Sequence, residues 1–67
     1  MDPAEIATLD RHIELYRAAA EGQKDIAVLS LQTSPPDYSS AATACHRALQ
    51  FTRQAEALRA YREAVTA

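Results

Sequence analysis

The sequence has very little of the residues that interrupt helices or cross-link chains. Its 67 residues include one glycine, three prolines, one cysteine and no tryptophan. Because Cys45 has no second cysteine to pair with, a disulfide within the chain is excluded, and a reducing, cytoplasmic setting is expected. The acidic start at Met1 and Asp2 does not resemble a basic secretion leader. Two histidines, His12 and His46, are too few for a metal cage, so neither a metal nor another cofactor is predicted.

Charge and length narrow the classes of function further. A net charge of −2 gives no electrostatic case for nucleic acid or membrane as the main partner. The longest apolar run, residues 26–29, is far too short to span a bilayer. A chain of this size buries barely enough apolar surface to offset its chain entropy. We therefore expect a homodimer or a tight complex with another protein.

Two similar helix-start signals lie about half the chain apart. Asp2 can cap a helix whose first residue is Pro3, and the same order recurs at Ser34, Pro35 and Asp37. This predicts an all-α fold made of one domain, residues 1–67, that forms an antiparallel two-helix hairpin. The expected helices span about residues 3–32 and 36–66, with a turn at about 33–35. We expect the hairpin to dimerise into a four-helix bundle.

Each expected helix carries an apolar row that predicts the seam between the two helices. Residues in these rows are spaced three and four apart, as in antiparallel bundles. In the second row alanines recur every seven residues and larger side chains every seven, so small residues allow the helices to approach closely. The first row is Ile6, Leu9, Ile13, Tyr16 and Ala20; the second is Ala41, Ala44, Ala48, Phe51, Ala55, Leu58 and Val65.

A second apolar row on each helix predicts surface beyond what one hairpin can bury. It comprises Leu15, Ala19, Gly22, Ile26 and Leu29 in the first half, and Tyr38, Ala42, Cys45 and Leu49 in the second. Such surface must be covered by a second copy or by a partner helix. The predicted dimer or partner interface therefore consists of Leu15, Ile26, Leu29, Tyr38, Cys45 and Leu49.

Residues 26–31 allow two interpretations. The favoured one continues the first helix to about residue 32, with Ala27 and Leu31 extending the seam and Gly22 marking a point of close approach in a four-helix bundle. The other ends the helix at Gly22 and makes residues 26–31 a short strand. A lone strand would present an unpaired edge, so helix is preferred.

Two capped helices, a short connection and an alanine-rich heptad seam resemble the Rop type of helical hairpin. The resemblance lies in this pattern and covers most of the chain. It implies a dimeric four-helix bundle and binding to paired RNA loops. Basic residues of the second helix would form the charged patch for an acidic or nucleic-acid partner: Arg47, Arg53, Arg59 and Arg62.

No catalytic constellation is present in the sequence. It lacks a serine–histidine–acid set, a glycine-rich phosphate loop and paired catalytic carboxylates, so an enzyme is not expected. We expect a small interaction protein that regulates or inhibits a partner protein through helix–helix contacts, similar in size and shape to regulators carried by phages and plasmids. Two alternatives are a Rop-like RNA- or DNA-binding regulator and a phage head–tail connector subunit. The connector form requires a strand at residues 26–31.

Overall fold

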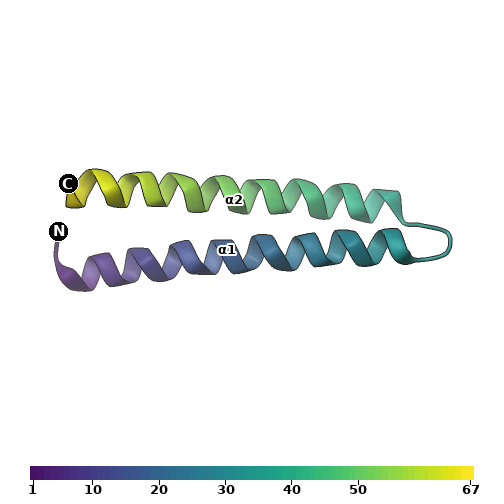
Figure 1. Cartoon of the computed structure of the whole chain (residues 1–67), viewed down its shortest axis with the longest axis horizontal. Helices are drawn as coiled ribbons and strands as arrows, with labels where there is room; N and C mark the ends of the chain where they lie inside the picture. The colour runs from purple at the N-terminus through teal and green to yellow at the C-terminus, as the bar shows by residue number, and fades with distance from the viewer.

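The computed structural model covers residues 1–67 and shows two long antiparallel helices joined by a short turn (Figure 1). Helix α1 spans Pro3–Gln32 and helix α2 spans Tyr38–Thr66. The all-α hairpin predicted from the sequence is therefore confirmed. Residues 26–31 belong to α1, so the strand interpretation is wrong. The molecule is a narrow rod with extents of 51 × 16 × 11 Å, and both termini lie at the end opposite the turn.

The first helix begins where its start signal predicts. Asp2 is the N-cap, its carboxylate accepts a hydrogen bond from the Ala4 backbone N–H at 2.9 Å, and Pro3 occupies the first helical position. The cap satisfies one of the backbone donors that a helix start leaves without an internal partner.

The second helix begins later than predicted. Its N-cap is Asp37, whose carboxylate accepts hydrogen bonds from the Ser40 backbone N–H at 3.0 Å and from the Ser40 hydroxyl at 2.7 Å. The predicted capping by Ser34, with Pro35 as the first helical residue, is wrong. A residue that precedes proline is disfavoured in the helical conformation, so Pro36 keeps Pro35 out of the helix. The helix therefore starts directly after both prolines, with Asp37 as its N-cap and Tyr38 as its first residue.

The turn is held to the end of α1 by polar contacts. The Asp37 backbone N–H donates to the Ser30 carbonyl at 2.8 Å. The Thr33 hydroxyl lies 2.8 Å from the same carbonyl and 3.0 Å from the Pro35 carbonyl. The Ser34–Pro35 peptide bond is cis. These contacts give partners to carbonyl oxygens that the helix end would otherwise leave free.

The core is a single thin seam between the two helices, and it follows the predicted rows. The buried residues are one isoleucine and six alanines, and the rings of Tyr16 and Phe51 pack across the seam with centroids 6.1 Å apart. Small side chains at the contact allow close helix approach but bury little apolar surface. The buried residues are Ile13, Ala20, Ala27, Ala41, Ala44, Ala48 and Ala55.

One predicted detail of α1 does not hold in the structure. Leu31 is 48% exposed, because the row that contains Ala20 and Ala27 continues three residues on to the half-buried Ser30. Gly22 is exposed, and a Cβ atom added to it would meet nothing within 4 Å. The close approach predicted at Gly22 belongs to a four-helix bundle, so it stays a prediction.

Candidate interaction surfaces

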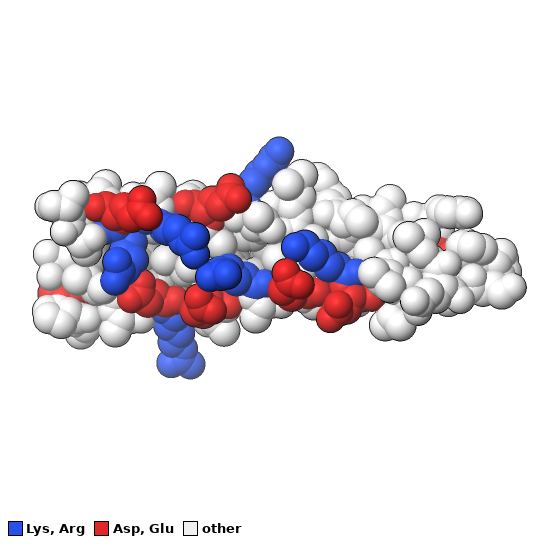
Figure 2. Space-filling model, viewed as in Figure 1, with Lys and Arg blue, Asp and Glu red and all other residues white.

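Charged side chains are almost absent from the turn end of the rod, residues 26–46, which holds 21 of the 67 residues. Between Asp25 and Arg47 the only Asp, Glu, Lys or Arg is Asp37. Figure 2 shows the same division on one face, where acidic and basic residues gather towards the termini and the turn end is almost free of them. We call residues 26–46 the turn end. Apolar side chains that have no charged neighbours are easier to cover with another apolar surface, because no charge has to be removed from water.

All six predicted interface residues are exposed in the hairpin. The exposed fractions are 56% for Leu15, 46% for Ile26, 62% for Leu29, 70% for Tyr38 and 47% for Leu49, and Cys45 is also exposed. Three further large apolar residues near the turn and the end of α2 are exposed as well: Val28, Leu31 and Tyr61. The surplus apolar surface expected from the sequence is present on the folded chain.

The exposed area is large for a chain of this mass. The hairpin exposes 4899 Å² and has a mass of 7.3 kDa. A compact monomer of that mass exposes about 4,200 Å², so the hairpin has an excess of about 700 Å². Each partner in a standard protein–protein interface buries roughly 800 Å². The excess therefore matches one interface of ordinary size.

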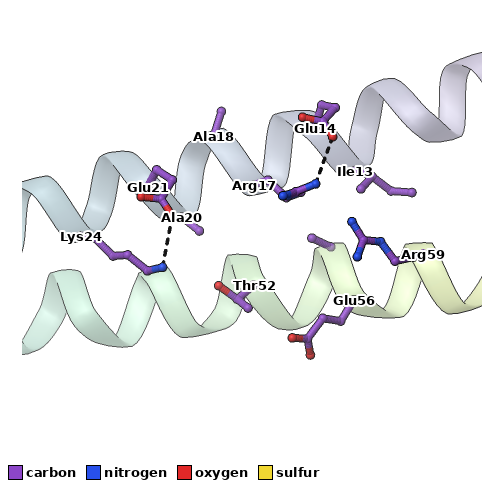
Figure 3. A pocket seen from close by; sticks show the side chains of 11 residues that line it. Ile13, Glu14, Arg17, Ala18, Ala20, Glu21, Lys24, Thr52, Glu56 and Arg59 are labelled. Atoms are coloured by element: carbon purple, nitrogen blue, oxygen red, sulfur yellow. Dashed lines mark hydrogen bonds and ion pairs between the residues drawn. The ribbon is translucent and has the colours of Figure 1, made fainter.

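A shallow groove runs between the helices in the charged part of the rod, outside the turn end (Figure 3). Its charged residues balance, because three acids and three bases line it. Lys24 pairs with Glu21 at 3.2 Å and Arg17 with Glu14 at 3.4 Å, each pair within α1. Exposed pairs of this kind contribute little to stability. The α2 side of the groove consists of Thr52, Ala55, Glu56 and Arg59.

The two extra apolar rows lie on opposite faces of the hairpin. We call Leu15, Ala19, Gly22, Ile26 and Leu29 the α1 stripe, and Tyr38, Ala42, Cys45 and Leu49 the α2 stripe. Residues three and four apart are neighbours on a helix surface, so the α2 stripe continues directly into Thr52 and Glu56 of the groove.

On α1, the groove is lined instead by a different row, which includes Arg17, Glu21 and Lys24 and continues to Val28. The α1 stripe lies on the side of α1 away from that row. One flat contact with a second hairpin would therefore cover one stripe and leave the other exposed.

The four arginines predicted as a charged patch do not gather on one surface. Arg62 reaches across to α1, where its Nε contacts the Asp10 carboxylate and its Nη2 lies 3.3 Å from the second carboxylate oxygen. Arg59 lines the groove, and Arg53 borders a second hollow with Tyr16 and Gln50 on another side of α2. Arg47 is exposed and forms no ion pair.

Sequence reasoning missed the Asp10–Arg62 pair, although a signal for it existed. In a hairpin that turns near residue 35, position 10 lies level with about position 60. Arg62 is within side-chain reach of that level.

One carboxyl group has a clearly shifted pKa. The Ser40 hydroxyl, and after it the Ser40 backbone N–H, hold the pKa of Asp37 below its ordinary value of 3.8 by hydrogen bonding to the charged form. His12, His46 and Cys45 are exposed, and no group of three or more His, Cys, Asp or Glu side chains is placed to hold a metal ion.

No protein-family model, curated protein or solved structure matches this chain. Neither helix combines the length and the hydropathy that crossing a membrane requires.

Proposed function

We propose that the chain is a small non-enzymatic interaction protein that regulates or inhibits a partner protein by packing against one of its helices. The observation that carries the proposal is the α2 stripe, an exposed apolar row that lies mostly in the nearly uncharged turn end of the folded hairpin. Amphipathic helices bind to such surfaces through apolar residues spaced three and four apart. The proposal includes a cytoplasmic setting, since the exposed thiol of Cys45 persists best in a reducing compartment.

The α2 stripe has the shape that a helix can occupy. Ala42 and Cys45 are small and lie between the larger Tyr38 and Leu49, so the row has a low centre with raised ends. Val28 of α1 lies on the same face and widens the apolar surface towards the turn. The expected partner segment is an amphipathic helix with few charges on its apolar face. Regulators of comparable size and shape are carried by phages and plasmids, and the proposal includes such an origin.

Site-specific photo-cross-linking tests the proposal. A benzoylphenylalanine residue at position 49 lies on the α2 stripe, and the same residue at Ala57 lies on an exposed part of α2 outside the stripe. In cells of the source organism, position 49 should give one or a few discrete adducts with another protein, and position 57 should give none of them. Adding the untagged chain in excess should remove the adducts, whereas adding its Leu49→Asp variant should not.

The same experiment can contradict the proposal. Equal adduct patterns from positions 49 and 57, or adducts that the Leu49→Asp variant removes as well as the unmodified chain does, would show that the stripe does not select a partner. Adducts containing only copies of the chain itself would point to self-association alone.

A nucleic-acid regulator of the Rop type is the second candidate. The observation that favours it is that three arginines of the predicted patch, Arg47, Arg53 and Arg59, are exposed and form no ion pair. It predicts RNA or DNA affinity that falls steeply with salt and is lost in Arg47→Glu and Arg53→Glu. The engagement of Arg62 by Asp10 reduces the charge available for it. The connector alternative loses its structural basis, because residues 26–31 are helical.

A further inference from the structure

We propose that the α1 stripe is the binding site for a second copy of the chain, with the two α1 helices antiparallel and a two-fold axis at Gly22. This inference rests on the proposed function, because it assigns the second copy to α1 and leaves the α2 stripe for the partner. Three observations support it: the place of Gly22, the symmetry of the stripe around it, and the area that the hairpin leaves exposed.

Gly22 has no explanation within the hairpin. It is the only glycine of the chain and lies inside α1, where glycine is less stable than alanine. It is exposed, and a Cβ atom there would meet nothing within 4 Å, so α2 does not require its small size. A residue without a side chain on an outer helix surface allows another helix backbone to come close.

The α1 stripe is nearly symmetric about Gly22. Leu15 lies seven residues before it and Leu29 seven residues after it, and both are more than half exposed. In an antiparallel pair centred on Gly22, Leu15 of one copy lies opposite Leu29 of the other, and the two Gly22 residues face each other. A two-fold contact uses the same patch on both copies, so a patch with this symmetry can pair with itself.

Charge favours the antiparallel orientation. No residue of the α1 stripe carries a charge, and Asp25 lies on the helix surface beside the stripe. A parallel pair would set Asp25 beside its own counterpart, which is a repulsive contact. The antiparallel pair sets it level with Ala18 and Ala19 of the second copy.

The exposed area fits one such contact. The hairpin exposes about 700 Å² more than a compact monomer of its mass. This is close to the roughly 800 Å² that each partner buries in a standard interface.

Disulfide trapping in a Cys45→Ala background tests the geometry. At a chain concentration high enough to keep the weakened dimer populated, mild oxidation should cross-link Gly22→Cys well ahead of Ala57→Cys, because the two copies place this position face to face. The double variant Leu15→Cys/Leu29→Cys should also cross-link, whereas each single variant should cross-link at least ten-fold more slowly. Ala57→Cys, on an exposed part of α2, is the matched control for random collisions. Circular dichroism of each variant should match that of the parent chain.

The outcomes separate this inference from the proposed function. Cross-linking of Leu15→Cys alone as fast as the double variant would show a parallel pair and overturn the inference. So would Gly22→Cys cross-linking no faster than Ala57→Cys. If the dimer is absent but the adduct from position 49 forms, the inference fails and the proposed function stands. If the dimer forms as described but position 49 gives no adduct, the proposed function fails and the inference stands.

Discussion

At the scale of single residues, Gly22 connects the fold to association. In the isolated hairpin it weakens α1 without making any contact that needs a glycine. Alanine at this position would make the helix of a single chain more stable. We therefore assign the role of Gly22 to the contact with another chain.

Substituting Gly22 by alanine should therefore act in opposite directions on folding and on association. At low concentration, where single chains dominate, Gly22→Ala should stabilise α1 by about 1 kcal/mol. For a domain of this size, that raises the melting temperature by roughly 4–8 °C. At high concentration the added methyl groups should meet at the two-fold axis and weaken the dimer. Thermal unfolding and light scattering at several concentrations measure both effects. An equal gain in melting temperature at all concentrations, with unchanged dimer affinity, would contradict the role of Gly22.

Asp37 gives the start of α2 a defined pH dependence. Its pKa is lowered in the folded chain by hydrogen bonds from Ser40, so the unfolded chain binds the proton more readily. The stabilisation should be complete above the unfolded pKa of about 3.8 and should disappear as pH falls through the lower folded value.

Asp37→Asn keeps a side-chain oxygen at the cap but removes the titration. The difference in urea midpoint between the original chain and this variant should shrink as pH falls from 5 to 2. A difference that stays constant over that range would show that the Ser40 contacts do not favour the charged carboxylate.

At the scale of elements, the alanine seam holds the two helices together. Ala48 is 5% exposed and lies in the middle of the buried row of α2. A larger side chain there cannot be accommodated without moving the helices apart.

Ala48→Leu should therefore destabilise the hairpin by roughly 1–3 kcal/mol through overpacking. Ala57→Leu is the control, because Ala57 is exposed on the same helix and its substitution should change stability by less than about 0.5 kcal/mol. Urea unfolding at a fixed low concentration compares the two. If both variants were equally stable, the seam would not be the tight contact described.

The helices and their seam could be predicted from the sequence because both depend on local spacing. Alanines that recur every seven residues lie on one side of a helix, whichever helix packs against them. Asp2 followed by Pro3 indicates a helix start without any information from the rest of the chain. The start of α2 was predicted too early, because the sequence offers two adjacent prolines as the first helical residue. Pro36 disfavours the helical conformation of the residue before it, which is Pro35. Leu31 was misjudged because two spacings, three and four residues after Ala27, were both consistent with a seam.

The candidate site could be predicted only in part. The exposed residues follow from the rows, because a residue outside the seam of a two-helix hairpin has nothing to cover it. Which face of the hairpin each row occupies depends on the direction of both helices and on their rotation, and so it became clear only in the structure. The same holds for the arginines, which are close in sequence but point to different sides of α2.

At the scale of the whole molecule, the rod has a charged part near the termini and a smaller, almost uncharged turn end (Figure 2). The charged part carries the groove and the Asp10–Arg62 pair that joins the helices. The turn end and the two stripes carry the surplus apolar surface. We propose that this surface serves association with other helices.

The most direct test of that claim is the mass of the chain in solution, measured by light scattering from micromolar to millimolar concentration at low and high salt. The mass should reach twice 7.3 kDa and should not fall as salt is added, because the contact is apolar. Leu29→Asp should return the mass to that of one chain while the helical circular dichroism is retained. A mass of one chain at every concentration, with full helicity, would contradict the assignment of the α1 stripe to a second copy.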